Sequence, residues 1–166
     1  MENQTNEKLI YIFQTTPLRK IIFLSIVTFG IYDIIWCYGL WKSLINKTNY
    51  KANPFLRSIF AGIMNFTLFP LINDYLKKHE REGFSSVIFA SLYLFMIMLS
   101  KLPEPYFLLS ILAIFILVKI QKEINSVNKK FYPQEISNSW NVTNTIWAII
   151  CTPLFLISLL NCFIKF

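Results

Sequence analysis

Residues Thr28–Trp41 read TFGIYDIIWCYGLW, an apolar and aromatic run that carries a single acid, Asp33, near its middle. Together with the apolar residues before it, this run predicts one helix over Ile21–Trp41. At about 1.5 Å per residue, that helix matches the ~30 Å apolar core of a bilayer. A charged side chain in the middle of a bilayer costs at least ~2.5–3.5 kcal/mol, so we expect Asp33 to face other helices or a hydrated pocket rather than lipid.

The composition of the whole chain is typical of a membrane protein. Of its 166 residues, 55% are hydrophobic and 15% are charged, whereas soluble domains average about 45–50% apolar and ~25% charged residues. Charged residues gather between long apolar runs, and the net charge is +7. Basic residues in such loops are typical of the cytoplasmic face beside anionic lipid, so we expect no nucleic-acid partner. The composition therefore predicts an all-α integral membrane helical bundle.

A polar N-terminal tail at residues 1–20 is expected to precede a membrane helical domain at residues 21–166. About four transmembrane helices are expected in that domain, the first at Ile21–Trp41. The others are predicted at Ser85–Ser100, Tyr106–Ile120 and Thr145–Ile164. The short linker Lys101–Pro105 predicts a tight hairpin between the second helix and the third. Pro153 predicts a kink in the fourth helix, because proline cannot donate the backbone hydrogen bond.

Phe55–Asn73 is an ambiguous element. It is apolar but contains Arg57 and Asn65, so it could span the membrane, lie at the interface or re-enter. Ser58, Ala61 and Asn65 fall on one narrow stripe at helical spacing, and stripes of small residues let helices approach closely in lipid. We therefore predict an embedded or interfacial helix that packs against the bundle through this stripe.

The third helix is expected to extend beyond the membrane. Ile120, Ile124 and Val127 recur at helical spacing within a basic segment, so the helix should continue until Pro133 ends it. The distribution of lysine and arginine places the charged segments 76–82 and 121–144 in the cytoplasm and the C-terminus outside. The side on which the N-terminus lies stays open.

An embedded Asp33 requires a partner. Arg57 is the first candidate, because a guanidinium group stays protonated and is itself hard to accommodate in lipid. Tyr38, Asn65 and Asn161 are further candidates, and Asp33, Arg57 and Asn65 form a candidate intramembrane polar cluster. Asp33 is open to three interpretations: a proton or cation site, a paired residue that fixes helix docking, or a position near one headgroup layer. The second is preferred, because transporters normally carry more intramembrane polar residues and broken helices.

Nothing in the sequence predicts an enzyme or a bound cofactor. The nucleophile-elbow, zinc-protease, phosphate-loop and dinucleotide-binding motifs are absent. His79 is the only histidine, which excludes the usual multi-histidine metal sites, and the three cysteines lie in apolar runs as expected of buried packing residues. The mixed-charge run at residues 74–82 is interpreted as a solvated helix end.

Three blocks of residues carry a family resemblance. The first block comprises Pro17, Lys20, Thr28-Phe29-Gly30-Ile31-Tyr32, Trp36, Tyr38, Trp41 and Lys42. The second comprises Asn53-Pro54, Arg57-Ser58-Ile59-Phe60, Asn65 and Leu68-Phe69, and a looser third comprises Ile124-Asn125, Asn141 and Asn144. Together they resemble a family of small bacterial inner-membrane proteins of unknown function, from whose pattern Cys37 and Gly39 depart. The resemblance implies a bacterial envelope protein and a shared structural role for Arg57, and it supplies no activity.

We therefore expect a multi-pass protein of the bacterial inner membrane that works through helix contacts, as a non-enzymatic envelope, assembly or interaction component. Its expected partners are the lipid bilayer and either copies of itself or other membrane proteins. The alternative is a small transport or channel subunit that uses Asp33, Arg57 and Asn65.

Overall fold

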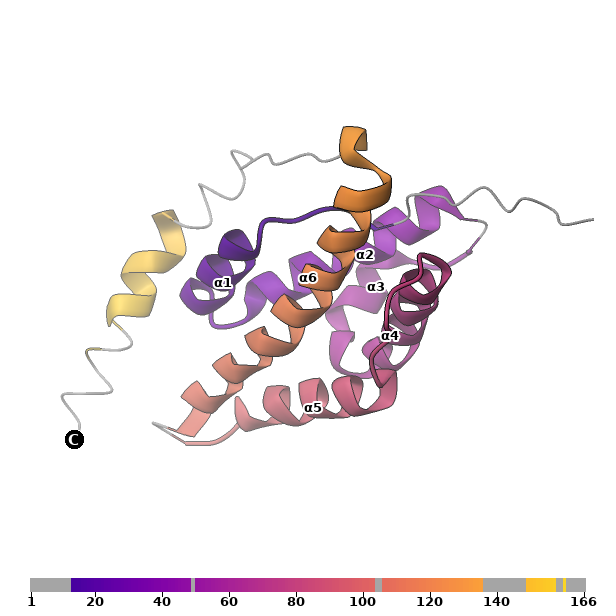
Figure 1. Ribbon diagram of the computed structural model, residues 1–166. Helices are drawn as coiled ribbons and strands as arrows, with labels where there is room; N and C mark the ends of the chain where they lie inside the picture. The colour runs from indigo at the N-terminus through magenta and orange to yellow at the C-terminus, as the bar shows by residue number, and fades with distance from the viewer. Residues whose placement is uncertain (1–12, 49, 104–105, 136–148, 158–159, 161–166) are drawn as a thin grey trace, which may run out of the picture.

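The computed structural model describes residues 13–48, 50–103, 106–135, 149–157 and 160 of the chain. The described part is all-α, as predicted, and contains no strand (Figure 1). Its elements are α1 (Leu18–Val27), α2 (Ile31–Lys47), α3 (Pro54–Ile59), α4 (Ala61–Lys78), α5 (Ser86–Leu99), the 3₁₀ helix η1 (Tyr106–Leu112), α6 (Ala113–Phe131) and the 3₁₀ turn η2 (Pro133–Glu135). A further helical stretch occupies residues 149–157.

The prediction of one helix over Ile21–Trp41 is wrong, because α1 stops at Val27 and α2 begins at Ile31. Phe29 and Gly30 have φ angles of 49° and 85°. The Gly30 N–H donates to the Ser25 carbonyl at 2.8 Å, as in a Schellman motif that ends a helix. Thr28 then starts the next helix, since its hydroxyl donates to the Leu24 carbonyl and accepts from the Tyr32 N–H. Because the stretch is apolar throughout, its hydropathy did not indicate that one helix ends at Val27 and another begins at Ile31.

The predicted helix over Phe55–Asn73 is likewise two helices, which join at Phe60. Asn53 caps α3 by accepting hydrogen bonds from two backbone N–H groups, and α4 continues through Pro70 to Lys78. The predicted packing stripe is confirmed. Its members Ser58, Ala61 and Asn65 are 1%, 3% and 0% exposed, and they face the neighbouring helices.

The prediction of a hairpin after α5 is confirmed. Helix α5 lies within one residue of the predicted Ser85–Ser100 and packs against both η1 and α6. The predicted helix Tyr106–Ile120 begins as the 3₁₀ helix η1 and continues as α6 to Phe131, just before Pro133. Its stripe is fully buried, and the stripe residues are Ile120, Ile124 and Val127.

The ends of the chain are described only in part. Of the predicted helix Thr145–Ile164, residues 145–148, 158–159 and 161–164 lie outside the described residues, and the stretch 149–157 is helical through Pro153. The kink at Pro153 stays a prediction. In this stretch Phe155 contacts Phe29 at a ring-centroid distance of 4.9 Å.

Residues 13–16, which belong to the predicted polar tail, lie along α6 and are held there by a row of carboxamides. The row consists of Gln121, Asn125 and Asn128. Asn125 accepts from the Thr16 N–H at 3.1 Å and donates to the Thr16 carbonyl at 2.7 Å. Asn128 donates to the Phe13 carbonyl at 2.8 Å, and the Phe13 side chain is fully buried. The part of the tail that is described is therefore packed structure.

Exposed apolar and exposed charged side chains occupy opposite ends of α2, α4 and α6. The last exposed large apolar residues of these helices are Ile35, Phe66 and Phe115, all in the first half of the helix. The exposed charged residues that follow are Lys42 and Lys47 on α2, Asp74, Lys77 and Lys78 on α4, and Lys119, Lys122, Lys129 and Lys130 on α6. In Figure 1, α2 and α6 both run from the lower left toward the upper right.

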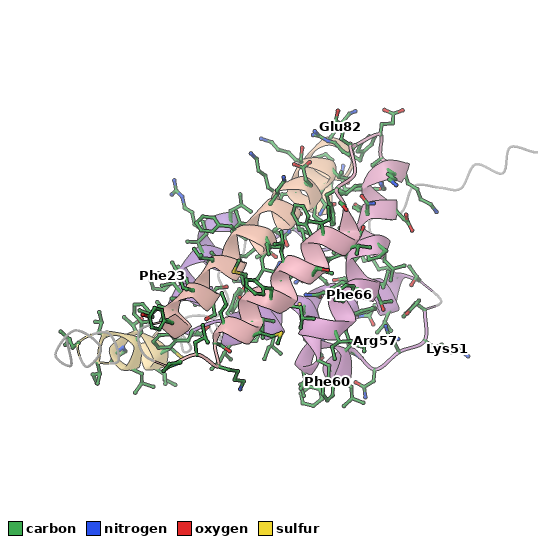
Figure 2. All side chains as sticks on the ribbon, turned by 90° about the horizontal axis from the view of Figure 1, so that it is seen from below. Phe23, Lys51, Arg57, Phe60, Phe66 and Glu82 are labelled. Atoms are coloured by element: carbon green, nitrogen blue, oxygen red, sulfur yellow. The ribbon has the colours of Figure 1, made fainter. Side chains whose placement is uncertain are left out.

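We call the two halves the apolar end and the charged end. The apolar end contains the starts of α2, α4 and α6 together with the end of α5 and η1. The charged end contains the C-terminal ends of α2, α4 and α6. Figure 2 shows Phe60 of the apolar end and Glu82 of the charged end on opposite sides of the view. Judged by length and hydropathy together, none of the helices within the described residues is a candidate membrane span.

Candidate functional site

A cavity of about 200 Å³ lies within the apolar end, where the starts of α2, α4 and α6 meet the ends of α1 and α5. Most of its wall is apolar. The polar side chains that line it are Ser25, Asp33, Tyr93, Ser100 and Ser110. Gly62 brings α4 close to α5, since a Cβ atom there would lie 3.1 Å from Leu94 Cδ1. The cavity therefore combines one carboxylate with several hydroxyl groups.

Asp33 lies in the first turn of α2 and is 6% exposed. The Ser25 hydroxyl donates to Asp33 Oδ1 at 2.6 Å, so Asp33 joins α1 to α2 across the turn that separates them. The N-terminal turn of a helix favours negative charge, which supports a carboxylate at this position. The prediction that Asp33 faces the interior is confirmed.

Arg57 is not the partner of Asp33, so that prediction is wrong. The guanidinium carbon of Arg57 lies 4.5 Å from the centroid of the Trp41 ring and 5.2 Å from that of Tyr50, which is a cation–π arrangement. Within the described part of the chain, no lysine, arginine or histidine forms an ion pair with Asp33. The break at Gly30 places Asp33 beside α1, whereas Arg57 packs near the other end of α2.

Asn65 is brought near Asp33 only through Cys37, which lies one turn further along α2. The Cys37 thiol is 3.7 Å from Asn65 Oδ1, and both residues are fully buried. Asn65 Nδ2 has no hydrogen-bond partner among the described residues. The candidate polar cluster thus divides into a buried line of Asp33, Cys37 and Asn65, with Arg57 elsewhere.

The chemistry that this site can perform is limited by its side chains. No group of three histidine, cysteine or acidic residues suited to a metal ion exists among the described residues. A buried carboxylate with one hydroxyl donor is stable either with a bound proton or beside a cation. The cavity can therefore hold a proton, a small cation or an ammonium group next to Asp33.

His79 at the charged end was missed, because the mixed-charge run around it was interpreted as solvated. That interpretation fits its exposed neighbours but is wrong for His79, which is 2% exposed. His79 Nδ1 lies 2.8 Å from the Tyr75 carbonyl, which can only accept, so Nδ1 carries the proton. Nε2 then accepts from the Tyr132 hydroxyl at 2.8 Å. Burial raises the pKa of Tyr132, which keeps this donor protonated.

The signal that could have located His79 is its spacing. It follows Tyr75 by four residues on the same helix face, and that face already carries the buried Ile72. A histidine that continues a buried apolar stripe at helical spacing is expected to be buried as well, even where the adjacent residues are charged.

No protein-family model matches the chain, and no curated protein or solved structure matches it either. The resemblance to a family of small inner-membrane proteins therefore stays a prediction, and the functional argument depends on the geometry above.

Proposed function

We propose that this chain is an integral protein of the bacterial inner membrane, with its apolar end in lipid and its charged end at the cytoplasmic face. In this proposal it is a non-enzymatic envelope, assembly or interaction component that works through helix contacts with the bilayer and with copies of itself or other membrane proteins. The single observation that supports the proposal is the separation of exposed apolar side chains from exposed charges along α2, α4 and α6.

The exposed apolar side chains are large and numerous. Four phenylalanines illustrate this, with exposed fractions of 60% for Phe55, 57% for Phe60, 55% for Phe95 and 68% for Phe115. Soluble monomers rarely expose continuous apolar patches of more than a few hundred Å². Lys101, in the connection after α5, is an exposed charge at the apolar end. Its long side chain suits a position at a headgroup layer.

The test is the accessibility of introduced cysteines to a water-soluble maleimide. In a background with the native cysteines replaced by alanine, we expect Lys129→Cys to react in inside-out vesicles. We expect Phe95→Cys to react only after detergent is added, because lipid shields it. Both positions are exposed in the structure, so they form a matched pair. Reaction of Phe95→Cys in intact membranes, or recovery of the chain in the soluble fraction without detergent, would contradict the proposal.

A second candidate function is a small transport or channel subunit, and the specific observation that favours it is the cavity beside Asp33. Arg57 has no place in this second function, because it packs on Trp41 and Tyr50. The test is proton or cation flux into proteoliposomes. Loss of flux in Asp33→Asn with retained expression would favour this candidate, and absence of flux in the wild type would exclude it.

A further inference from the structure

The Arg57 guanidinium group packs on two aromatic rings, and within the described part of the chain no residue takes a hydrogen bond from its edges. The guanidinium carbon lies 4.5 Å from the centroid of the Trp41 ring and 5.2 Å from that of Tyr50, and the two ring centroids are 5.9 Å apart. No carboxylate or carbonyl accepts a hydrogen bond from Arg57 among the described residues. A guanidinium group offers five N–H donors in a planar fork, so donors remain for an external anion.

The segment around Arg57 is basic and contains no acidic residue of its own. Between Asp33 and Asp74 the sequence has no acidic residue, and its charged residues are Lys42, Lys47, Lys51 and Arg57. The Lys42 ammonium lies 5.9 Å from the centroid of the Tyr38 ring. Tyr50, which contacts Arg57, also lines a shallow hollow of about 520 Å³ together with Thr48 and Lys51. Tyr50 thus links the Arg57 contact to a hollow that Lys51 also lines.

Arg57 lies where the apolar end gives way to the charged end. On α2, exposed apolar residues stop at Ile35 and exposed charges begin at Lys42, with Trp41 beside that boundary. On α3, the neighbours of Arg57 include the exposed Phe55 and Leu56. Figure 2 shows Arg57 close to Phe60, with Lys51 on the adjoining loop. In a membrane, tryptophan, tyrosine and arginine at such a boundary lie at the level of the headgroups.

We propose that Arg57, held on Trp41 and Tyr50, binds the phosphate group of an anionic phospholipid. Arginine recognises phosphate through two parallel hydrogen bonds, and Lys51 supplies a second positive charge. The exposed apolar residues of α3 contact the acyl chains of the same lipid. This inference rests on the proposed membrane location for the source of the phosphate, whereas the recognition of phosphate by Arg57 does not depend on it.

The test uses the full chain purified in a neutral detergent. Its thermal unfolding is followed after addition of phosphatidylglycerol, of phosphatidylcholine or of soluble glycerol 3-phosphate. We expect phosphatidylglycerol to raise the unfolding temperature clearly more than phosphatidylcholine, because the choline cation of phosphatidylcholine offsets the charge of its phosphate beside the cationic Arg57. Arg57→Gln should weaken the apparent affinity for phosphatidylglycerol about tenfold or more, because charge-assisted hydrogen bonds are lost. Arg57→Lys should lose less, since it keeps the charge without the fork.

Two further variants complete the test, one as a control and one as a second probe of the site. Lys129→Gln removes the same charge at the charged end and should respond to phosphatidylglycerol as the wild type does. Lys51→Gln leaves the aromatic contact of Arg57 in place and should weaken the response partly, so the test holds even if Arg57→Gln folds poorly. An undiminished response in a folded Arg57→Gln protein, or an equal response to both lipids, would overturn the inference.

The soluble ligand separates the two sources of phosphate. An Arg57-dependent response to phosphatidylglycerol alone supports the lipid source. An equal response to glycerol 3-phosphate overturns the lipid source and assigns Arg57 to a soluble phosphate ester. If the cysteine experiment contradicts the membrane location while Arg57-dependent binding of glycerol 3-phosphate persists, then the proposed function fails and the phosphate site stands.

Discussion

The two ends of the molecule differ in how completely their buried polar side chains are hydrogen-bonded. At the charged end and along α6, carboxamide and imidazole groups are bonded on both sides, as in the chain from His79 through Tyr75 and Asn128 to residues 13–16. At the apolar end, Asp33 receives one hydroxyl donor, and Asn65 Nδ2 has no partner among the described residues. Buried polar groups with all their hydrogen bonds formed contribute to the fold. Buried polar groups with missing hydrogen bonds lower the stability of the fold, so their presence requires another explanation.

This difference in hydrogen bonding distinguishes side chains that stabilise the fold from side chains that are candidates for a functional site. The bonded network ties the N-terminal segment, α4 and α6 together, and its loss should reduce stability. The site beside Asp33 has unused polar capacity facing a cavity, and changes there should alter ligand or proton binding more than stability. Substitutions at each end test this contrast.

The largest effect is expected for Asn128→Leu. It removes the donations from Asn128 to the Phe13 carbonyl and to the Thr15 hydroxyl, together with the acceptor of the Tyr75 hydroxyl. We expect a loss of about 3 kcal/mol in the free energy of unfolding, because buried partners lose their hydrogen bonds. Urea unfolding in detergent measures the loss. The exposed neighbour substitution Lys129→Ala should cost under ~0.5 kcal/mol. Equal stability of the two variants would show that the network is not needed.

A pair of tryptophans on α2 tests the contrast between bonded and unbonded groups separately from the contrast between the two ends. Trp36 and Trp41 are both almost fully buried, yet Trp36 Nε1 donates to Gln121 Oε1 at 2.7 Å while Trp41 Nε1 has no partner in the described part of the chain. Both Trp→Phe changes remove similar volume. Trp36→Phe should therefore cost about 1–2 kcal/mol more than Trp41→Phe in the same unfolding measurement. A larger loss for Trp41→Phe would contradict this ranking.

Much of the fold was predictable from periodicity. Helix α5 and the extension of α6 toward Pro133 followed from apolar spacing and from a proline, which act locally. The breaks at Phe29-Gly30 and at Phe60 were not predicted. Hydropathy is nearly uniform across both breaks. At the first break, the features that end and start the helices are hydrogen bonds of the Thr28 side chain and the positive φ angles of Phe29 and Gly30. At the second break, Phe60 leaves the helical conformation with a φ angle of −92° and a ψ angle of 33°.

The candidate site was only partly predictable, because its contacts depend on how the helices pack and not on local hydropathy. The inward orientation of Asp33 follows from the cost of exposing a charge to lipid, and it is confirmed. Its pairing with Arg57 was wrong because Arg57 packs on Trp41, which lies eight residues further along α2 at about 1.5 Å per residue. The amide row on α6 was not predicted, because Gln121, Asn125 and Asn128 lie in a basic segment of which only the charge and the apolar spacing were interpreted. All three bond to residues 13–16, which lie more than a hundred positions away in the sequence, and two of them, Gln121 and Asn128, are fully buried.

Gly30→Ala tests whether the apolar end depends on backbone conformation. Gly30 has a φ angle of 85°, and an added Cβ atom would lie 3.7 Å from Asp33 Oδ2, an ordinary contact. The expected cost of about 1 kcal/mol is thus conformational strain and not steric overlap. Gly30→Asn should cost less, because asparagine tolerates positive φ angles better than alanine. Thermal unfolding of the two variants checks this, and an equal or greater loss for Gly30→Asn would count against the strain argument.

The smallest change in stability is expected for Asp33→Asn. The amide has nearly the shape of the carboxylate, and its oxygen can still accept the hydrogen bond from the Ser25 hydroxyl. Because the substitution also removes a charge that no described residue pairs with, the free energy of unfolding should change by less than ~0.5 kcal/mol or increase. A loss above ~2 kcal/mol would mean that Asp33 is as firmly integrated as Asn128 and that the two ends do not differ. Asp33→Leu is the matched contrast, since it leaves the buried Ser25 hydroxyl without this acceptor and should cost more than Asp33→Asn. A near-neutral Asp33→Asn beside a costly Asp33→Leu would mean that Asp33 contributes a hydrogen bond to the fold and leaves its charge for a proton or a cation.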